Sequence, residues 1–144
     1  MNKEKLKFLK PKKESQLGQW LLENSISAGF PSPADDFKEI RISLDKELVK
    51  NKESTFYARV SGDSMEDAGL SDGDLIIIDR ALDPVKNKIA VCFLDGDFTV
   101  KRIIERRSKL YLKPENKDYK EIEIKKDSQF IVWGIVTYVI KKLL

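Results

Sequence analysis

Short runs of apolar and β-branched residues, separated by polar turns, recur along the chain from residue 56 onward. Runs of this length, bounded by Gly, Asp, Asn and Ser, are typical of strands in a mainly β domain. We expect strands at Phe56–Val60, Leu75–Ile78, Ile89–Leu94, Phe98–Ile104, Lys109–Lys113, Glu121–Ile124 and Phe130–Ile140. The pattern predicts a twisted β-sandwich or a partial barrel of short strands.

Local signals add a turn and a helix to this pattern. The dipeptide Asp95–Gly96 favours a two-residue type I′ hairpin between the strands on either side of it. Ser43 is a suitable N-cap for a short helix over Leu44–Lys50. The longest apolar stretch, Phe130–Ile140, has 11 residues. A membrane-spanning helix needs ~20, so we interpret this stretch as a buried strand.

The first part of the chain has a different composition. Residues 1–14 are rich in lysine, and we expect them to be mobile. Residues 28–34, Ala-Gly-Phe-Pro-Ser-Pro-Ala, hold two prolines in three positions, which favours an extended and exposed backbone. We therefore divide the chain into an N-terminal arm, residues 1–28, and a body, residues 29–144.

Charge follows the same division. The chain carries a net charge of +3, and residues 1–28 hold six lysines and three glutamates, which accounts for all of it. A basic arm is compatible with nucleic-acid contact, although a solvated tail is the simpler interpretation. The near-neutral body argues against direct sequence-specific DNA binding, because phosphate contacts need a concentrated positive surface.

Two residue counts limit the chemistry. The chain has no histidine, which excludes a Ser-His-Asp triad and a His-ligated metal. Its single cysteine, Cys92, forms no intramolecular disulfide and is expected in the core; one free thiol fits a reducing cytoplasm. The N-terminus lacks the apolar region of a signal peptide, so we expect a soluble cytoplasmic protein with no membrane partner. We expect no metal and no other cofactor.

Six acidic residues in the middle of the chain match no calcium loop and are interpreted as turn formers and solubilising charges. They are Asp63, Glu66, Asp67, Asp72, Asp74 and Asp79.

A serine and a lysine remain as candidates for chemistry. Ser64 follows a predicted strand and the turn-forming Gly62, before a segment that could begin a helical turn; alone, it is most simply a turn residue. Strand alternation places Thr99 and Lys101 on one face, so the Thr99 hydroxyl is positioned to hydrogen-bond the amine. A strand lysine usually faces solvent, and it acts as a base only when burial favours its neutral form. Such a lysine would accept the proton of a serine nucleophile.

Three motifs occur together and in order: Ser-Gly-Asp-Ser-Met at 61–65, Ser-Asp-Gly-Asp at 71–74, and Asp-Gly-Asp-Phe-Thr-Val-Lys at 95–101. With them the chain resembles the self-cleaving serine peptidases of the LexA, phage repressor and UmuD family (S24). Residues 28–34 resemble the UmuD cleavage region in particular. In that family the lysine follows the serine by 37 residues, which is the difference between 64 and 101 here. The likeness covers about four-fifths of the chain, from Gly29 to the C-terminus.

The resemblance implies a LexA/UmuD-like peptidase fold in which Ser64 is the nucleophile, Lys101 is the general base and Ala28–Gly29 is the scissile bond. It further implies a homodimer of the SOS response whose slow self-cleavage is promoted by a RecA filament on single-stranded DNA. The product, residues 29–144, would join a Y-family (UmuC-like) translesion DNA polymerase in DNA repair and mutagenesis. Ala28 stands where UmuD proper tends to carry Cys, and both are small. An arm of 28 residues is too short for a repressor's DNA-binding domain, which favours the UmuD branch.

Two other classes of function stay open at this point. The first is a non-enzymatic polymerase accessory module whose Ser64 and Lys101 persist without use. The second is a type I signal peptidase, which also combines a Ser-Met motif with a lysine base but acts at a membrane through an N-terminal anchor that this sequence lacks.

Overall fold

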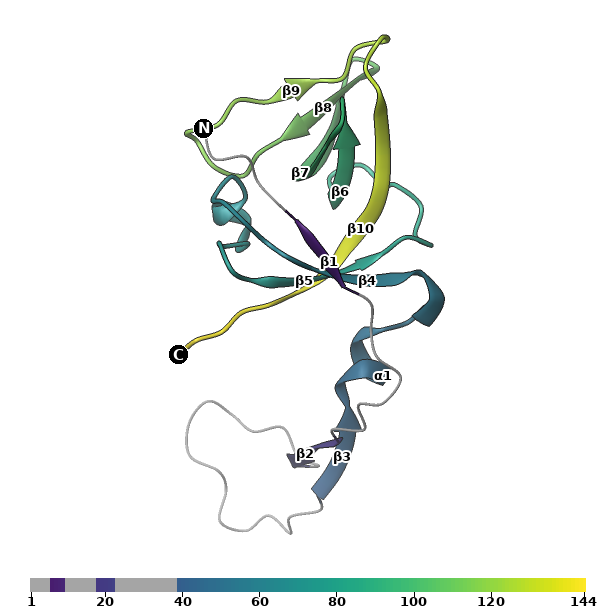
Figure 1. Cartoon of the computed structure of the whole chain (residues 1–144), viewed down its shortest axis with the longest axis vertical. Coiled ribbons are helices and arrows are strands. Elements are labelled where there is room, and N and C mark those ends of the chain that lie inside the picture. Colours follow the sequence, from purple (N-terminus) through teal and green to yellow (C-terminus); the bar gives the residue numbers. More distant parts are fainter. Residues whose placement is uncertain (1–5, 10–17, 23–38) are drawn as a thin grey trace. The chain divides into compact units, whose positions relative to one another are not determined.

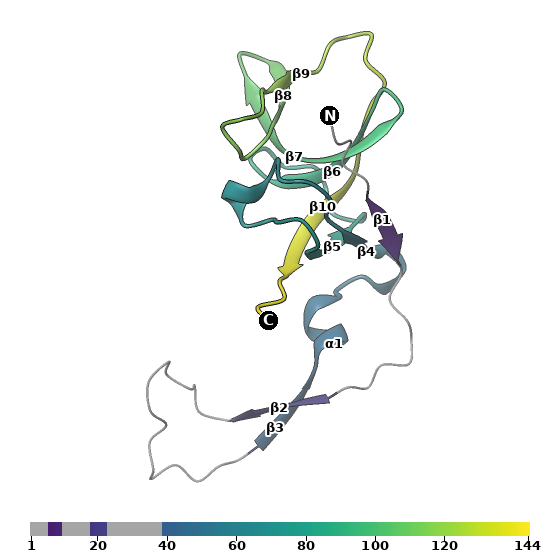
Figure 2. The same ribbon diagram turned by 60° about the vertical axis from the view of Figure 1, so that its left-hand side comes forward.

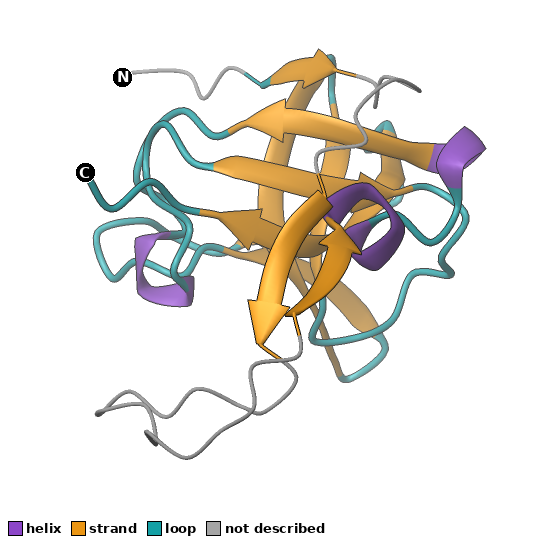
Figure 3. Ribbon diagram, turned by 90° about the horizontal axis from the view of Figure 1, so that it is seen from below, coloured by secondary structure: helices purple, strands orange, loops and turns teal. Residues whose placement is uncertain are grey.

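The computed structural model describes residues 6–9, 18–22 and 39–144. The chain divides into two compact units, one of Met1–Pro11 with Asn51–Leu144 and one of Lys12–Lys50. Strands make up most of the regular structure in the described residues, and the helical segments are short (Figure 3). The mainly β fold expected from the sequence is confirmed. None of the helices in the described ranges is long and apolar enough to cross a bilayer.

The smaller unit contains one strand pair and one short helix. Strands β2 (Gly18–Leu22) and β3 (Glu39–Ser43) pair antiparallel, and helix α1 (Leu44–Leu48) follows directly. Ser43 caps α1, as expected, by accepting a hydrogen bond from the Lys46 backbone N–H at 3.5 Å. The helix ends two residues before the predicted end, because Val49 has an extended backbone.

An antiparallel sheet of eight strands forms the larger unit. Its spatial order is β1-β4-β5-β10-β6-β7-β8-β9, and it twists so strongly that β6 to β9 curl over on one side (Figures 1 and 2). The strands are β1 (Lys7–Leu9), β4 (Thr55–Arg59), β5 (Leu75–Asp79), β6 (Ile89–Leu94), β7 (Asp97–Arg106), β8 (Lys109–Lys113), β9 (Ile122–Glu123) and β10 (Phe130–Ile140). Short 3-10 helices precede β4, as η1 (Lys52–Ser54), and follow it, as η2 (Glu66–Ala68). All seven strands predicted in the body are present.

The N-terminal residues contain a strand that composition did not predict. Residues 1–14 were expected to be mobile, but Lys7–Leu9 form β1 and pair antiparallel with β4 at the edge of the sheet (Figures 1 and 2). Apolar packing holds this strand on the sheet. Phe8 is partly buried, and its ring lies 5.1 Å from that of Phe98 and 4.6 Å from that of Trp133. The lysine-rich composition of residues 1–14 gave no indication that Phe8 would anchor a strand.

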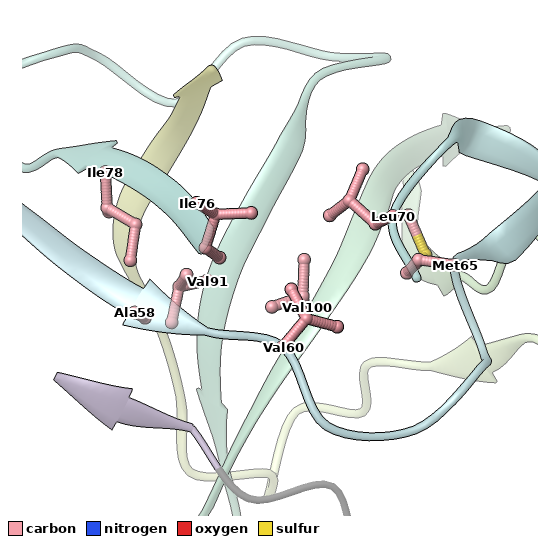
Figure 4. Packing of buried hydrophobic residues seen from close by; sticks show 8 residues of the cluster. All are labelled: Ala58, Val60, Met65, Leu70, Ile76, Ile78, Val91 and Val100. Carbon is pink, nitrogen blue, oxygen red and sulfur yellow. The ribbon is translucent and has the colours of Figure 1, made fainter. Parts of the chain in front are cut away.

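Buried side chains form two clusters. The first, shown in Figure 4, consists of Ala58, Val60, Met65, Leu70, Ile76, Ile78, Val91 and Val100. The second consists of Ala90, Cys92, Ile103, Leu112 and Ile135. Alternation along β6 explains the division, because Val91 points to one cluster while Ala90 and Cys92 point to the other. Cys92 is 0% exposed, so its predicted core position is confirmed.

Two local features shape the centre of the sheet: the turn between β6 and β7, and the middle of β10. Asp95 and Gly96 have φ of 47° and 93°, both positive as a type I′ hairpin requires. Strand β10 carries register shifts toward β6 and toward β5. Near its centre, a Cβ added at Gly134 would lie 2.5 Å from Cγ2 of Ile78, so the two strands approach too closely for a side chain. The prediction that β10 is buried is correct only at its centre, since Ile131 is 61% exposed.

Candidate active site

Ser64 lies in the loop between β4 and η2. Two backbone hydrogen bonds hold the start of this loop, from Val60 N–H to Asp74 O and from Gly73 N–H to Val60 O, each 2.8 Å. Gly62, with φ of 97°, makes the turn that follows, and its N–H donates to Asp72 Oδ1 at 2.9 Å. The expected helical turn after Ser64 is present as η2, so the loop presents the Ser64 side chain to the sheet.

Lys101 projects from the middle of β7, where it pairs in register with Ala90 of β6. The preceding residue, Val100, is buried in the first apolar cluster, and Ile103, two residues after Lys101, is buried in the second. Lys101 itself is only 6% exposed, in contrast to the solvent-facing position that a strand lysine usually takes.

The serine and the lysine are in direct contact. Lys101 Nζ donates a hydrogen bond to Ser64 Oγ at 3.0 Å, and Ser64 is 1% exposed. The same nitrogen donates to Thr99 Oγ1 at 2.7 Å and to the Val100 carbonyl at 3.0 Å. The contact between Thr99 and the amine is the one expected from their shared strand face. The structure therefore brings together three side chains that sequence reasoning singled out from two distant segments.

A second loop braces the segment around Ser64, and sequence reasoning missed it. In the connection between β8 and β9, Asn116 Nδ2 donates to the Asp63 carbonyl at 2.8 Å, and the Tyr119 hydroxyl donates to the Asp63 carboxylate. Glu115 O accepts from Asp67 N–H at 2.8 Å. These partners lie about 50 residues from Ser64 in the sequence, so nothing in the local pattern pointed to them.

A surface hollow of about 340 Å³ opens beside this bracing loop. It is lined by Asp67, Lys113, Pro114, Glu115, Asn116, Lys117, Tyr119 and Glu121. Both acidic and basic side chains line this hollow. Ser64 and Lys101 are not part of its lining. Among the described residues, no group of three or more Cys, Asp or Glu side chains is arranged to hold a metal ion.

Two acidic residues near the site have structural roles. Asp74 and Asp79, interpreted from sequence as turn formers and solubilising charges, are 7% and 4% exposed. Burial opposes ionisation of Asp79, but hydrogen bonds from Asn51, the Ala81 N–H and Ser54 outweigh it and lower its pKa. At Asp74, burial is likewise outweighed, by Lys141 and the Ser71 N–H. Both carboxylates accept hydrogen bonds from backbone N–H groups in turns at the ends of β5, so they are turn formers as expected. Their burial corrects the interpretation of these two residues as solubilising charges.

Cys92 lies close to Lys101 but has a different character. Burial raises the pKa of its thiol from 9.0 to about 12, with the nearby Lys101 charge opposing the shift. The thiol is therefore neutral near pH 7 and inert as a nucleophile. The remaining predicted site residues, Ala28 and Gly29, lie outside the described residues, as does the boundary between arm and body.

A buried serine in hydrogen-bond contact with a buried lysine, on a mainly β scaffold without histidine, indicates a serine peptidase. The chain belongs to the Peptidase S24-like family, whose model matches residues 20–137. This confirms the resemblance to LexA and UmuD found in the sequence motifs.

Individual relatives agree with this assignment. The chain is 40% identical to protein MucA of Salmonella typhimurium over 114 residues, which cover 78% of this chain and 77% of MucA. It is 37% identical to protein ImpA of Salmonella typhimurium over 122 residues, covering 85% of this chain and 83% of ImpA. It is 32% identical to the LexA repressor of Aliivibrio fischeri over 129 residues, covering 89% of this chain but only 61% of the repressor.

Proposed function

We propose that this protein is a self-cleaving serine peptidase that cuts its own Ala28–Gly29 bond with Ser64 as nucleophile and Lys101 as general base. The observation that carries the proposal is the hydrogen bond of 3.0 Å between Lys101 Nζ and Ser64 Oγ, both nearly inaccessible to solvent. A nucleophile and its base must lie within such reach for the proton to pass between them.

Lys101 Nζ has two further hydrogen-bond partners beside Ser64. A neutral amine has two N–H donors and one lone pair; the Val100 carbonyl can only accept, and the Thr99 hydroxyl can accept. To act as a base, Nζ must first be unprotonated; the hydrogen bond that Lys101 donates to Ser64 Oγ in the structure is then reversed, and the Ser64 hydroxyl donates its proton to Nζ. This arrangement favours attack by Ser64 Oγ.

The proposed reaction has two stages. Ser64 Oγ bonds to the Ala28 carbonyl carbon while its proton passes to Lys101, and the Gly29 amine leaves with that proton as the peptide bond breaks. The resulting ester joins residues 1–28 to Ser64. Water, deprotonated by Lys101, then hydrolyses the ester and releases the arm. The small side chain of Ala28 and the bare Gly29 suit an extended segment entering a narrow site.

The biological role follows from the family resemblance. We propose that the protein acts in the SOS response as a homodimer, that a RecA filament on single-stranded DNA speeds its cleavage, and that residues 29–144 become an accessory subunit of a Y-family (UmuC-like) translesion DNA polymerase. Support comes from the similarity to MucA and ImpA over most of both chains and from the UmuD-like segment at 28–34. The accessory-module alternative gives no reason for Ser64 and Lys101 to remain in contact.

The experiment adds RecA, ATP and single-stranded DNA to the purified chain at neutral pH and follows the products by mass spectrometry. We expect a fragment beginning at Gly29 to form faster than without the filament. Ser64→Ala with the same filament is the control and stays intact. Cleavage of an added pre-protein instead would support the signal peptidase alternative, and an unaltered chain under all conditions would support the accessory module.

A further inference from the structure

The strand β1 occupies one edge of the sheet. In the order β1-β4-β5, β4 has β1 as its outer neighbour, so without β1 the backbone N–H and C=O groups on that side of β4 would face solvent. The register pairs Phe8 with Ala58, Lys7 with Arg59 and Leu9 with Tyr57. Residues 7–9 thus cover an edge that is otherwise suited to pairing with another extended segment.

Phe8 is the aromatic anchor of this strand, and Leu6, just before the strand, packs against the same apolar cluster. The ring of Phe8 packs 4.6 Å from that of Trp133 and 5.1 Å from that of Phe98, in tilted and edge-to-face geometries. Leu9 points the other way and is 41% exposed. An aromatic anchor flanked by main-chain pairing is the usual way in which an extended peptide is held at a sheet edge.

The fit is nonetheless imperfect. Three residues make a short ladder, and the register places Lys7 at the position opposite Arg59, which carries the same charge. The Arg59 side chain is exposed and donates through Nη1 to the Gly73 carbonyl at 2.9 Å. A guanidinium has five N–H donors, so Arg59 can bind a carboxylate as well. A segment with an acidic residue at this position would match the edge better than β1 does.

Tethering explains how a weak strand stays in place. Within one chain, a linked segment has an effective concentration on the order of millimolar, which favours a contact that would be negligible between separate molecules. A cut between residues 28 and 29 ends the covalent connection between β1 and β4. The strand would then dissociate and leave the β4 edge and the Phe98–Trp133 face open.

We propose that the β4 edge and the aromatic face of Phe98 and Trp133 form a strand-docking site, which β1 covers in the uncut chain. The occupant after cleavage is an extended segment of a partner protein, with an aromatic residue opposite Ala58 and an acidic residue opposite Arg59. The timing of this exchange rests on the proposed self-cleavage; the docking site itself does not.

The test therefore uses full-length chains that cannot cut themselves. The probe is a fluorescent peptide of residues 3–13 carrying Lys7→Glu, and its binding to the Ser64→Ala chain is followed by fluorescence anisotropy. In the Ser64→Ala chain that also carries Phe8→Ala, we expect binding at least tenfold tighter than in Ser64→Ala alone, because the tethered strand has lost its anchor. Leu9→Ala in the same background is the matched control and keeps the site closed.

One further variant and one further peptide complete the test. Phe8→Pro, which also removes a backbone N–H from β1, opens the site even if Phe8→Ala leaves the strand paired. The same peptide with its natural Lys7 binds several-fold more weakly. Equal binding to all of the chains, or no binding to either Phe8 variant, would overturn the proposal. Tight binding to the Phe8 variants, together with a parent chain that retains Ser64 and still never releases a Gly29 fragment, would leave the docking site intact and refute the self-cleavage instead.

Discussion

At the scale of single residues, the Lys101 amine decides what the protein can do. Its nitrogen lies between Ser64 Oγ, Thr99 Oγ1 and the Val100 carbonyl, and it is almost completely removed from water. Ser64 and Lys101 could be chosen from the sequence through the resemblance of their motifs to a known family, and Thr99 through strand alternation. Burial of Lys101 could not be predicted, because it depends on strands on both sides of β7.

Thr99→Val tests the positioning role of the Thr99 hydroxyl. The substitution removes the acceptor that lies 2.7 Å from Lys101 Nζ while keeping a similar shape. Loss of one such hydrogen bond, about 1 to 1.5 kcal/mol, should slow self-cleavage about tenfold. The rate is measured by following the fragment that begins at Gly29. Thr99→Ser should restore most of the rate, and a Thr99→Val rate equal to that of the parent would contradict the assigned role.

The buried thiol of Cys92 should lower the free energy of unfolding at alkaline pH. Its thiol has a pKa of about 12 in the folded chain against an ordinary 9.0, so between these values the folded state keeps a proton that the unfolded state has lost. The folded state binds more protons, and the free energy of unfolding must therefore fall as pH rises, by roughly 1.4 kcal/mol per pH unit above 9.

Urea unfolding at pH 8, 9.5 and 11 measures this effect. Cys92→Ala should be less stable than the parent at pH 8 but should lose less stability between pH 9 and 11. Parallel pH profiles for the parent and Cys92→Ala would show that Cys92 is not the group responsible.

At the scale of elements, the alternation of apolar and polar residues was sufficient to predict the body strands. Strands β6, β8 and β10 have the predicted bounds, and the hairpin at Asp95–Gly96 has the predicted positive φ angles. Strand β1 escaped prediction because its aromatic anchor, Phe8, packs against rings more than 80 residues away in the sequence. The bracing of Asp63 by Asn116 and Tyr119 escaped for the same reason.

The close approach of β10 to β5 leads to a prediction at this scale. A Cβ at position 134 would lie 2.5 Å from the Ile78 Cγ2 methyl, which belongs to a branched side chain that is 0% exposed and cannot move aside. Gly134→Ala should therefore lower the free energy of unfolding by about 1 to 3 kcal/mol. Chemical denaturation measures the change. Ile131→Ala, on the exposed end of the same strand, should cost much less, and equal costs would contradict the steric argument.

At the scale of the whole molecule, the proposed cleavage would change the net charge. Residues 1–28 hold six lysines and three glutamates, which is the full net charge of +3, so a cut after residue 28 would leave a body with 21 basic and 21 acidic residues. We expect the uncut chain to bind single-stranded DNA, or the filament formed on it, with a steeper salt dependence than residues 29–144. The logarithmic slopes should differ by up to about 2. Titrations over a range of salt concentrations test this, and equal slopes would show that the arm does not contact phosphate.

The central claim is that Ser64 and Lys101 cut the bond between Ala28 and Gly29. The intact mass of the purified chain is measured after incubation at about pH 10, where a larger fraction of any lysine amine is unprotonated than at pH 7, beside Ser64→Ala and Lys101→Ala. Circular dichroism confirms that each sample stays folded at that pH. We expect a new species beginning at Gly29 in the parent alone. A parent that stays intact while folded, or a Gly29 fragment that also forms in either variant, would contradict it.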